Sequence, residues 1–169
     1  PKQHRTKTVL IILTHSCNLN CSYCYEHHKN AEKMSIEMAK EIIEKEMLEQ
    51  DGLDREFEFF GGEPFLEFEM VKELYDYLNN RTWDKRWIVQ FTTNGVLVHG
   101  EIQKWLKERS DKIRLGLSAD GTREMHNANR SNSYDLIDFA FFAEAGTDIK
   151  MTVSTETLPH LSEGIIHLH

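Results

Sequence analysis

The feature that most limits the fold of this chain is a regular alternation of strand-like and helix-like segments. The strand-like segments are residues 8–14, 56–60, 87–93, 113–118 and 148–154. The helix-like segments are residues 35–50, 67–79, 101–108, 133–145 and 159 onward, with apolar residues recurring at helical spacing. Five β-then-α units predict an α/β fold, in which parallel strands are joined by helical crossovers.

The alternation alone leaves the architecture open, because an open doubly wound sheet and a barrel-like sheet share this pattern. The unbroken apolar run from Val9 to Leu13 is typical of a strand buried on both faces. A complete (β/α)8 barrel takes about 250 residues, whereas this chain has 169. If the sheet is a barrel, we expect one domain, residues 1–169, that is incomplete at its C-terminal end.

The three cysteines of the chain lie together, directly after the first predicted strand. Cys17, Cys21 and Cys24 have the spacing C-x3-C-x2-C. An odd, clustered set argues against a disulfide framework and favours a metal or cluster site in a reducing cytoplasm. Three thiolates can hold three irons of a [4Fe-4S] cluster. The fourth iron then keeps an open position for a small molecule.

Zinc is the alternative that the cysteine spacing leaves open. His27 or His28 follows closely enough to complete a Cys3His site. Zinc ligands usually come in C-x2-C pairs, so a single loop of three cysteines after a buried strand favours the iron–sulfur interpretation. The zinc interpretation would make the chain a non-catalytic interaction module.

Charge and hydropathy exclude some classes of partner. The formal net charge is −8 and no basic segment stands out, which disfavours a nucleic-acid partner. No apolar run approaches the roughly 20 residues that cross a bilayer, so no membrane segment is expected.

The cysteine loop resembles the cluster-binding motif of the radical S-adenosylmethionine (radical SAM) superfamily. That motif has the same spacing and an aromatic residue before its last cysteine, here Tyr23. The resemblance implies a [4Fe-4S] cluster on Cys17, Cys21 and Cys24, with S-adenosyl-L-methionine as the second cofactor. It also implies that the backbone at Tyr23 contacts the adenine. The fold implied is a partial (β/α) barrel.

A second segment extends the resemblance at the end of the second predicted strand. Gly61, Gly62, Glu63 and Pro64 are similar to the GGEP motif, which approaches the cofactor's amino group. Glycines allow close backbone approach to a ligand, and a glutamate offers negative charge to an ammonium group. Taken alone, the pair of glycines favours a simple turn that leads into a helix.

Further motif residues follow later predicted strands. Asn94 lies in a Thr-Asn-Gly segment, and Ser118 and Asp120 form the S-x-D-G pattern that the family often shows. By the same resemblance, His126 and Arg130 match an H…R segment, and Arg130 would pair with the methionine carboxylate. Ser154, which ends the fifth predicted strand, is a further cofactor contact of this kind. Turns and a solvated arginine are the structural alternatives.

The resemblance implies reductive cleavage of S-adenosylmethionine to a 5′-deoxyadenosyl radical that abstracts hydrogen from a substrate. The nearest group modifies peptides and proteins, as do SPASM-type maturases and anaerobic sulfatase-maturating enzymes. A peptide or protein substrate and an electron donor such as flavodoxin or ferredoxin are therefore expected. A small metabolite or RNA is the alternative substrate. The sequence gives no indication of the oligomeric state.

Overall fold

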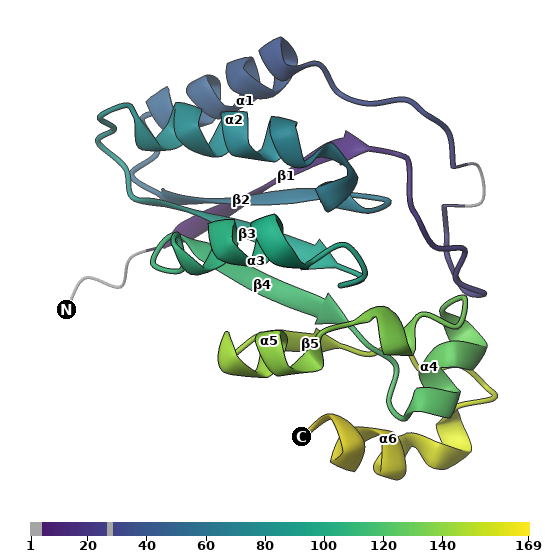
Figure 1. Cartoon of the computed structure of the whole chain (residues 1–169). Coiled ribbons are helices and arrows are strands. Elements are labelled where there is room, and N and C mark those ends of the chain that lie inside the picture. The colour runs from purple at the N-terminus through teal and green to yellow at the C-terminus, as the bar shows by residue number, and fades with distance from the viewer. Residues whose placement is uncertain (1–4, 27–28) are drawn as a thin grey trace.

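The computed structural model describes residues 5–26 and 29–169. Its five strands are β1 (Thr6–Thr14), β2 (Asp54–Gly61), β3 (Trp87–Thr93), β4 (Ile113–Ser118) and β5 (Asp148–Lys150). They form one parallel sheet in the order β1-β2-β3-β4-β5 (Figure 1). Because neighbouring strands are consecutive in the chain, the sheet is part of a (β/α) barrel and is not doubly wound. The predicted parallel α/β fold is confirmed.

Helices provide the crossovers between these strands. The first three are α1 (Ile36–Leu48), α2 (Phe68–Asn79), preceded by the 3-10 turn η1 (Pro64–Glu67), and α3 (Gly100–Lys107). Ser35 caps α1, because its hydroxyl accepts a hydrogen bond from the Met38 N–H at 3.2 Å. The helices α6 (Leu161–Leu168) and η3 (Leu158–His160) follow β5. The predicted fifth helix thus begins as a 3-10 turn.

One hydrophobic core lies between the sheet and the helices that cover it. Alternate residues of β2 and β3 enter this core, where they meet apolar residues of α1, α2, α3 and α5 (Phe139–Glu144). In β1, Ile11 and Leu13 are buried, but Leu10 and Ile12 are 53% and 39% exposed. The prediction that this strand is buried on both faces is therefore wrong. Among the described residues, helices cover only one face of the sheet, so an entirely apolar strand leaves alternate side chains uncovered.

The connection between β4 and β5 corrects a second prediction. A single helix was expected over residues 133–145, but two shorter elements form there instead: the 3-10 turn η2 (Tyr134–Leu136) and α5 (Phe139–Glu144). A further helix, α4 (Arg123–Asn129), precedes them in a segment where no helix was predicted. Ile137 is extended, and the Asp138 carboxylate caps α5 by accepting from the Phe141 N–H at 3.1 Å. Thr122 caps α4 in the same way. Local capping thus divides the predicted helix.

The fifth strand ends earlier than predicted, at Lys150 rather than at residue 154. The N–H of Thr152 donates to a carboxylate oxygen of Asp120 at 3.0 Å. This side-chain bond takes the backbone out of the sheet, because a strand continues only while its N–H groups find partners in the neighbouring strand.

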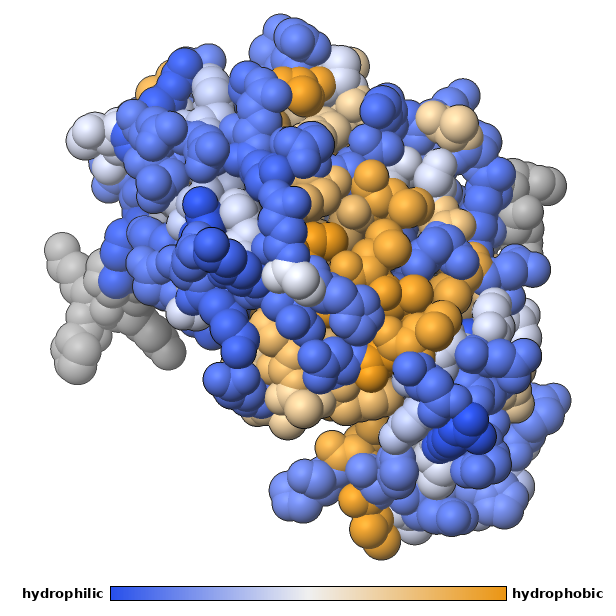
Figure 2. Space-filling view, viewed as in Figure 1, coloured by the Kyte–Doolittle hydropathy of each residue, from blue (hydrophilic) through white to orange (hydrophobic). Residues whose placement is uncertain are grey.

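The face that Figure 2 shows is mostly hydrophilic, with apolar areas near its middle and around α6. In α6, Ile165 and Ile166 are 56% and 77% exposed. No helix of the described chain is long and apolar enough to cross a membrane.

Candidate active site

A pocket of about 390 Å³ lies at the carboxyl ends of the strands. Parallel α/β folds place their ligands at this edge. Its walls come from the loop after β1, the ends of β2, β3 and β4, and the segment after α4. A second hollow of about 490 Å³ lies between α3 and α5, but none of the predicted site residues lines it. We therefore place the candidate site in the smaller pocket, because the predicted site residues line it.

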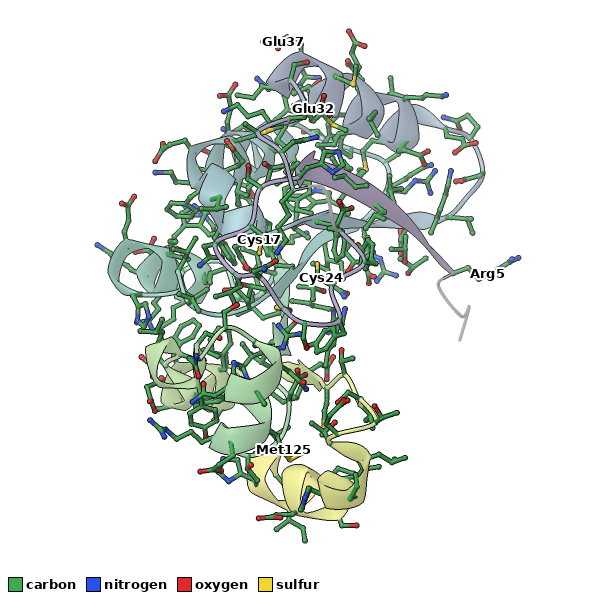
Figure 3. All side chains as sticks on the ribbon, turned by 90° about the vertical axis from the view of Figure 1, so that its right-hand side faces the viewer. Arg5, Cys17, Cys24, Glu32, Glu37 and Met125 are labelled. Atoms are coloured by element: carbon green, nitrogen blue, oxygen red, sulfur yellow. The ribbon has the colours of Figure 1, made fainter. Side chains whose placement is uncertain are left out.

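All three cysteines line this pocket, each half-buried and in the free thiol form. Cys17 and Cys24 lie in the middle of the molecule, with α1 and α2 above them and α4 and α6 below (Figure 3). The Leu19 N–H donates to the Cys17 sulfur at 3.4 Å, and the Asn94 amide nitrogen lies 3.9 Å from the same sulfur. N–H groups that point at sulfur are what a cluster-bound thiolate needs.

Burial raises the pKa of both Cys17 and Cys21. Two cations oppose this effect. Lys29 lowers the pKa of both thiols, and Arg130 lowers the pKa of Cys21 more than Lys29 does. The ammonium of Lys29 also donates to the backbone oxygen of Leu19 within the loop. Cations beside thiols are typical of sites where thiolates act as ligands.

The described residues contain no group of three His, Cys, Asp or Glu side chains close enough together to hold a metal ion. The three thiols therefore have to converge when they bind a cluster. The donor set still fits a [4Fe-4S] cluster, because three thiols of one loop share a pocket that contains N–H donors and cations. His27 and His28, the ligands of the zinc alternative, lie outside the described residues.

The two glycines at the end of β2 allow its backbone to approach the cysteine loop. The N–H of Gly62 donates to the Thr14 oxygen at 3.0 Å, and that of Glu63 donates to the Ser16 oxygen at 2.9 Å. A Cβ on Gly61 would lie 2.3 Å from the Thr14 oxygen, and one on Gly62 would lie 2.2 Å from the Ser16 oxygen. Both glycines line the pocket, and the structure gives them a further role in close backbone packing.

Glu63 lies behind the pocket wall rather than on it. Its side chain is fully buried, and its two oxygens accept from the N–H of Phe65 at 3.2 Å, the hydroxyl of Thr93 at 2.9 Å and the N–H of Asn94 at 2.8 Å. Burial raises the pKa of Glu63 to about 7, although these hydrogen bonds oppose it. Glu63 therefore joins the ends of β2 and β3. Pro64 is also buried, at the start of η1.

Asn94 connects the end of β3 to the cysteine loop. Its side-chain nitrogen donates to the side-chain oxygen of Asn18 at 2.7 Å. Its own side-chain oxygen accepts from the N–H of Val96 at 3.0 Å, in a turn completed by Gly95 with φ of 81°. Asn94 also lines the pocket, so the turn and the site coincide here.

Asp120 is fully buried, and its two oxygens accept four hydrogen bonds. One oxygen accepts from the Tyr23 hydroxyl at 2.6 Å and from Nε of Arg130 at 3.1 Å. The guanidinium of Arg130 lies over the Tyr23 ring, 5.4 Å from its centroid, and lines the pocket. Burial and the bond to Asp120 raise the pKa of Tyr23. Asp120 itself does not line the pocket.

Two predicted serines have different positions. Ser118, at the end of β4, lines the pocket. Ser154 does not, because it forms a turn with Thr157, whose hydroxyl accepts from the Ser154 N–H at 2.9 Å. Thr152 lines the pocket instead. The sequence motifs did not identify Lys29, Thr92 and Thr152 as residues of the pocket. Of these, only Thr92 could have been found, because it alternates with buried neighbours near the end of a predicted strand.

His126 is fully buried beside this network. Its ring accepts from the Asp120 N–H at 3.4 Å, and Nε2 lies 3.0 Å from the Ser133 hydroxyl oxygen. Burial, assisted by Arg130, lowers the pKa of His126 to about 4. The ring is therefore neutral at pH 7 and serves as a packing residue.

The pKa of His126 leads to a prediction about acid stability. The unfolded chain takes up this proton near pH 6.5, but the folded chain does so only near pH 4, so stability falls as the pH drops between these values. We expect a loss of up to about 2 kcal/mol between pH 6.5 and 5 from this group. An NMR titration should show no ring protonation above pH 5 in the folded chain. Protonation near pH 6.5, as in the urea-unfolded chain, would contradict the assignment.

A parallel α/β sheet with a cysteine-lined pocket at its carboxyl edge is the arrangement of a cofactor-dependent barrel enzyme. Residues 11–153 match the Radical SAM superfamily, and the chain belongs to this family. The uncharacterised protein MJ0907 of Methanocaldococcus jannaschii is 28% identical over 170 residues, which span 96% of this chain and 58% of that protein.

Relatives with assigned names point the same way. A cysteine-type anaerobic sulfatase-maturating enzyme of Clostridium perfringens (strain 13 / Type A) is 33% identical over 138 residues, which span 73% of this chain and 35% of that enzyme. The structure of native anSMEcpe with bound AdoMet and Kp18Cys peptide superposes with a TM-score of 0.82 at 26% identity, over 96% of this chain and 48% of that one. The chain thus spans about half the length of that structure.

Proposed function

We propose that residues 1–169 are the core domain of a radical SAM enzyme, in which Cys17, Cys21 and Cys24 hold a [4Fe-4S] cluster. The observation that carries this proposal is the presence of three thiols from one short loop in one pocket at the carboxyl ends of the strands. Family membership supports it. When bound, the cluster supplies one electron to S-adenosylmethionine, whose cleavage gives methionine and a 5′-deoxyadenosyl radical.

The residues of the chain bind and orient the cofactor in this proposal. Arg130 takes the methionine carboxylate, since its guanidinium lines the pocket while Asp120 holds its Nε. Gly61 and Gly62 let the backbone reach the amino group, and Ser118 approaches the ribose. Glu63, with both oxygens engaged, acts by fixing the backbone rather than by touching the ligand.

We further propose a peptide or protein substrate. The support is the likeness to the sulfatase-maturating enzyme of Clostridium perfringens and to anSMEcpe, whose structure holds a peptide. A soluble one-electron donor such as flavodoxin or ferredoxin would reduce the cluster. A reducing compartment such as the cytoplasm would keep the three thiols free.

Anaerobic reconstitution with iron and sulfide tests the proposal. We expect about four irons and four sulfides per chain. After reduction with dithionite, added S-adenosylmethionine should yield methionine and 5′-deoxyadenosine. A colourless protein that binds one zinc and leaves S-adenosylmethionine intact would overturn the proposal in favour of the zinc module.

A further inference from the structure

The second half of the cysteine loop rests against the end of α4. The N–H of Asn20 donates to the Ser131 hydroxyl and the N–H of Ser22 donates to the Asn129 backbone oxygen, each at 2.9 Å. Between these contacts and the pocket, the Cys24 N–H donates to the Cys21 oxygen at 3.1 Å and closes a turn. Two cysteines therefore sit on a turn whose support comes from more than a hundred residues away.

Tyr23 lies within that turn, and its side chain reaches past the docked backbone to Asp120. The oxygen that accepts the Tyr23 hydroxyl at 2.6 Å also accepts from Nε of Arg130 and from the Asn129 amide at 3.4 Å. The other oxygen accepts from the Thr152 N–H. A single buried carboxylate thus joins the cysteine loop, the end of α4 and the segment after β5.

The backbone that supports the loop is itself strained. Ser131 and Asn132 both have φ of 54°, a left-handed conformation that is uncommon outside glycine. Such residues persist only where the surrounding structure holds them, and they gather at functional sites. The strain lies at the surface on which the loop docks, which is a second observation independent of the Asp120 contacts.

We propose that Asp120 is a positioning residue: through the Tyr23 hydroxyl it holds the Cys21–Cys24 turn, and through Nε it holds Arg130, so that both face the same pocket. Asp120 does not touch the ligand, because it is fully buried behind the pocket wall. The hydroxyl explains why this chain needs a tyrosine and not simply an aromatic ring at position 23. The effect on cofactor binding rests on the proposed function, but the hydrogen bonds from Tyr23 and Arg130 to Asp120 are present in the chain without cofactors.

Two variants remove the hydrogen bond between Tyr23 and the Asp120 carboxylate in different ways. Tyr23→Phe deletes only the hydroxyl and keeps the ring beneath Arg130. Asp120→Asn keeps the shape, but its amide nitrogen must face either Arg130 or the Thr152 N–H, and both of these are donors. Matched controls are Tyr77→Phe, which deletes a hydroxyl bonded to Glu44 at 3.3 Å, and Asp135→Asn, which breaks an exposed ion pair with Arg123.

Amide hydrogen exchange in the apo chain, followed by NMR, measures how firmly the Cys21–Cys24 turn is held when no cofactor is present. We expect the Ser22 and Cys24 amides to exchange about tenfold faster in Tyr23→Phe and at least as fast in Asp120→Asn, because a hydrogen bond to a charged group is lost. Amides in the core strand β3 should keep their rates. The double variant should exchange no faster than Asp120→Asn, since both changes break the same contact.

Unchanged exchange at Ser22 and Cys24 in Tyr23→Phe would overturn the proposal. So would an equal acceleration in the loop and in β3, or in the Tyr77→Phe control, because general destabilisation would then be the cause. A reconstituted sample gives a second measurement: Tyr23→Phe should alter the electron paramagnetic resonance spectrum of the reduced cluster with added S-adenosylmethionine. If loop exchange responds as expected but the chain takes up no iron on reconstitution, the proposed function fails while the positioning role of Asp120 stands.

Discussion

Replacing Cys21 with alanine is expected to abolish bound iron and S-adenosylmethionine cleavage together. The loop offers three thiols and the chain has no other cysteine, so two thiolates would have to hold a cluster that needs three protein ligands. The described structure gives the Cys21 thiol no hydrogen bond, and it is only half-buried. The apo chain should therefore keep its free energy of unfolding to within about 1 kcal/mol.

The measurement is iron and sulfide per chain after anaerobic reconstitution, with urea unfolding of the apo chain beside it. Ser22→Ala is the matched control, since it changes an exposed side chain of the same loop and leaves the thiols in place. Cys17→Ala and Cys24→Ala should behave like Cys21→Ala. A full complement of iron in any of the three would remove that residue from the ligand set.

The second large effect is expected at Gly62. In Gly62→Ala the new Cβ would lie 2.2 Å from the Ser16 oxygen and 2.9 Å from Cβ of Cys17, and the nearest atoms are backbone that cannot turn aside. The end of β2 must move away from the cysteine loop, which breaks the bonds from Gly62 N to Thr14 O and from Glu63 N to Ser16 O. We expect the apo chain to lose about 2–4 kcal/mol of unfolding free energy.

The displaced backbone should also weaken iron binding, because Cys17 lies directly against Gly62. Urea unfolding and iron content measure the two effects separately. Gly52→Ala is the control: that glycine has φ of 70° and nothing within 4 Å of the added Cβ, so only about 1 kcal/mol of backbone strain is expected. Equal losses at both glycines would contradict the prediction, because close packing against Ser16 would then add nothing at Gly62.

Much of the fold could be predicted because its signals are local. The ranges of β3 and β4 match the predicted ones, and α1 and α2 begin and end within about two residues of prediction. Two of the exceptions have tertiary causes. β1 is uncovered on one face, and Asp120 ends β5 by accepting the Thr152 N–H. The division of residues 133–145 has a local cause, the capping of α5 by Asp138, which the prediction from helical spacing did not include.

The sequence by itself determined the order of the elements and the place of the cysteine loop, because hydrophobic period and motif spacing act over a few neighbouring residues. Only the tertiary structure decided which polar motif residues face the pocket. Ser118, Asn94 and Arg130 do, whereas the Glu63 and Asp120 carboxylates are fully buried and hydrogen-bond to neighbouring segments of the chain. The physical reason is that a carboxylate's role depends on the donors that surround it. Those donors, Thr93 for Glu63 and Tyr23 for Asp120, come from segments that only folding brings together.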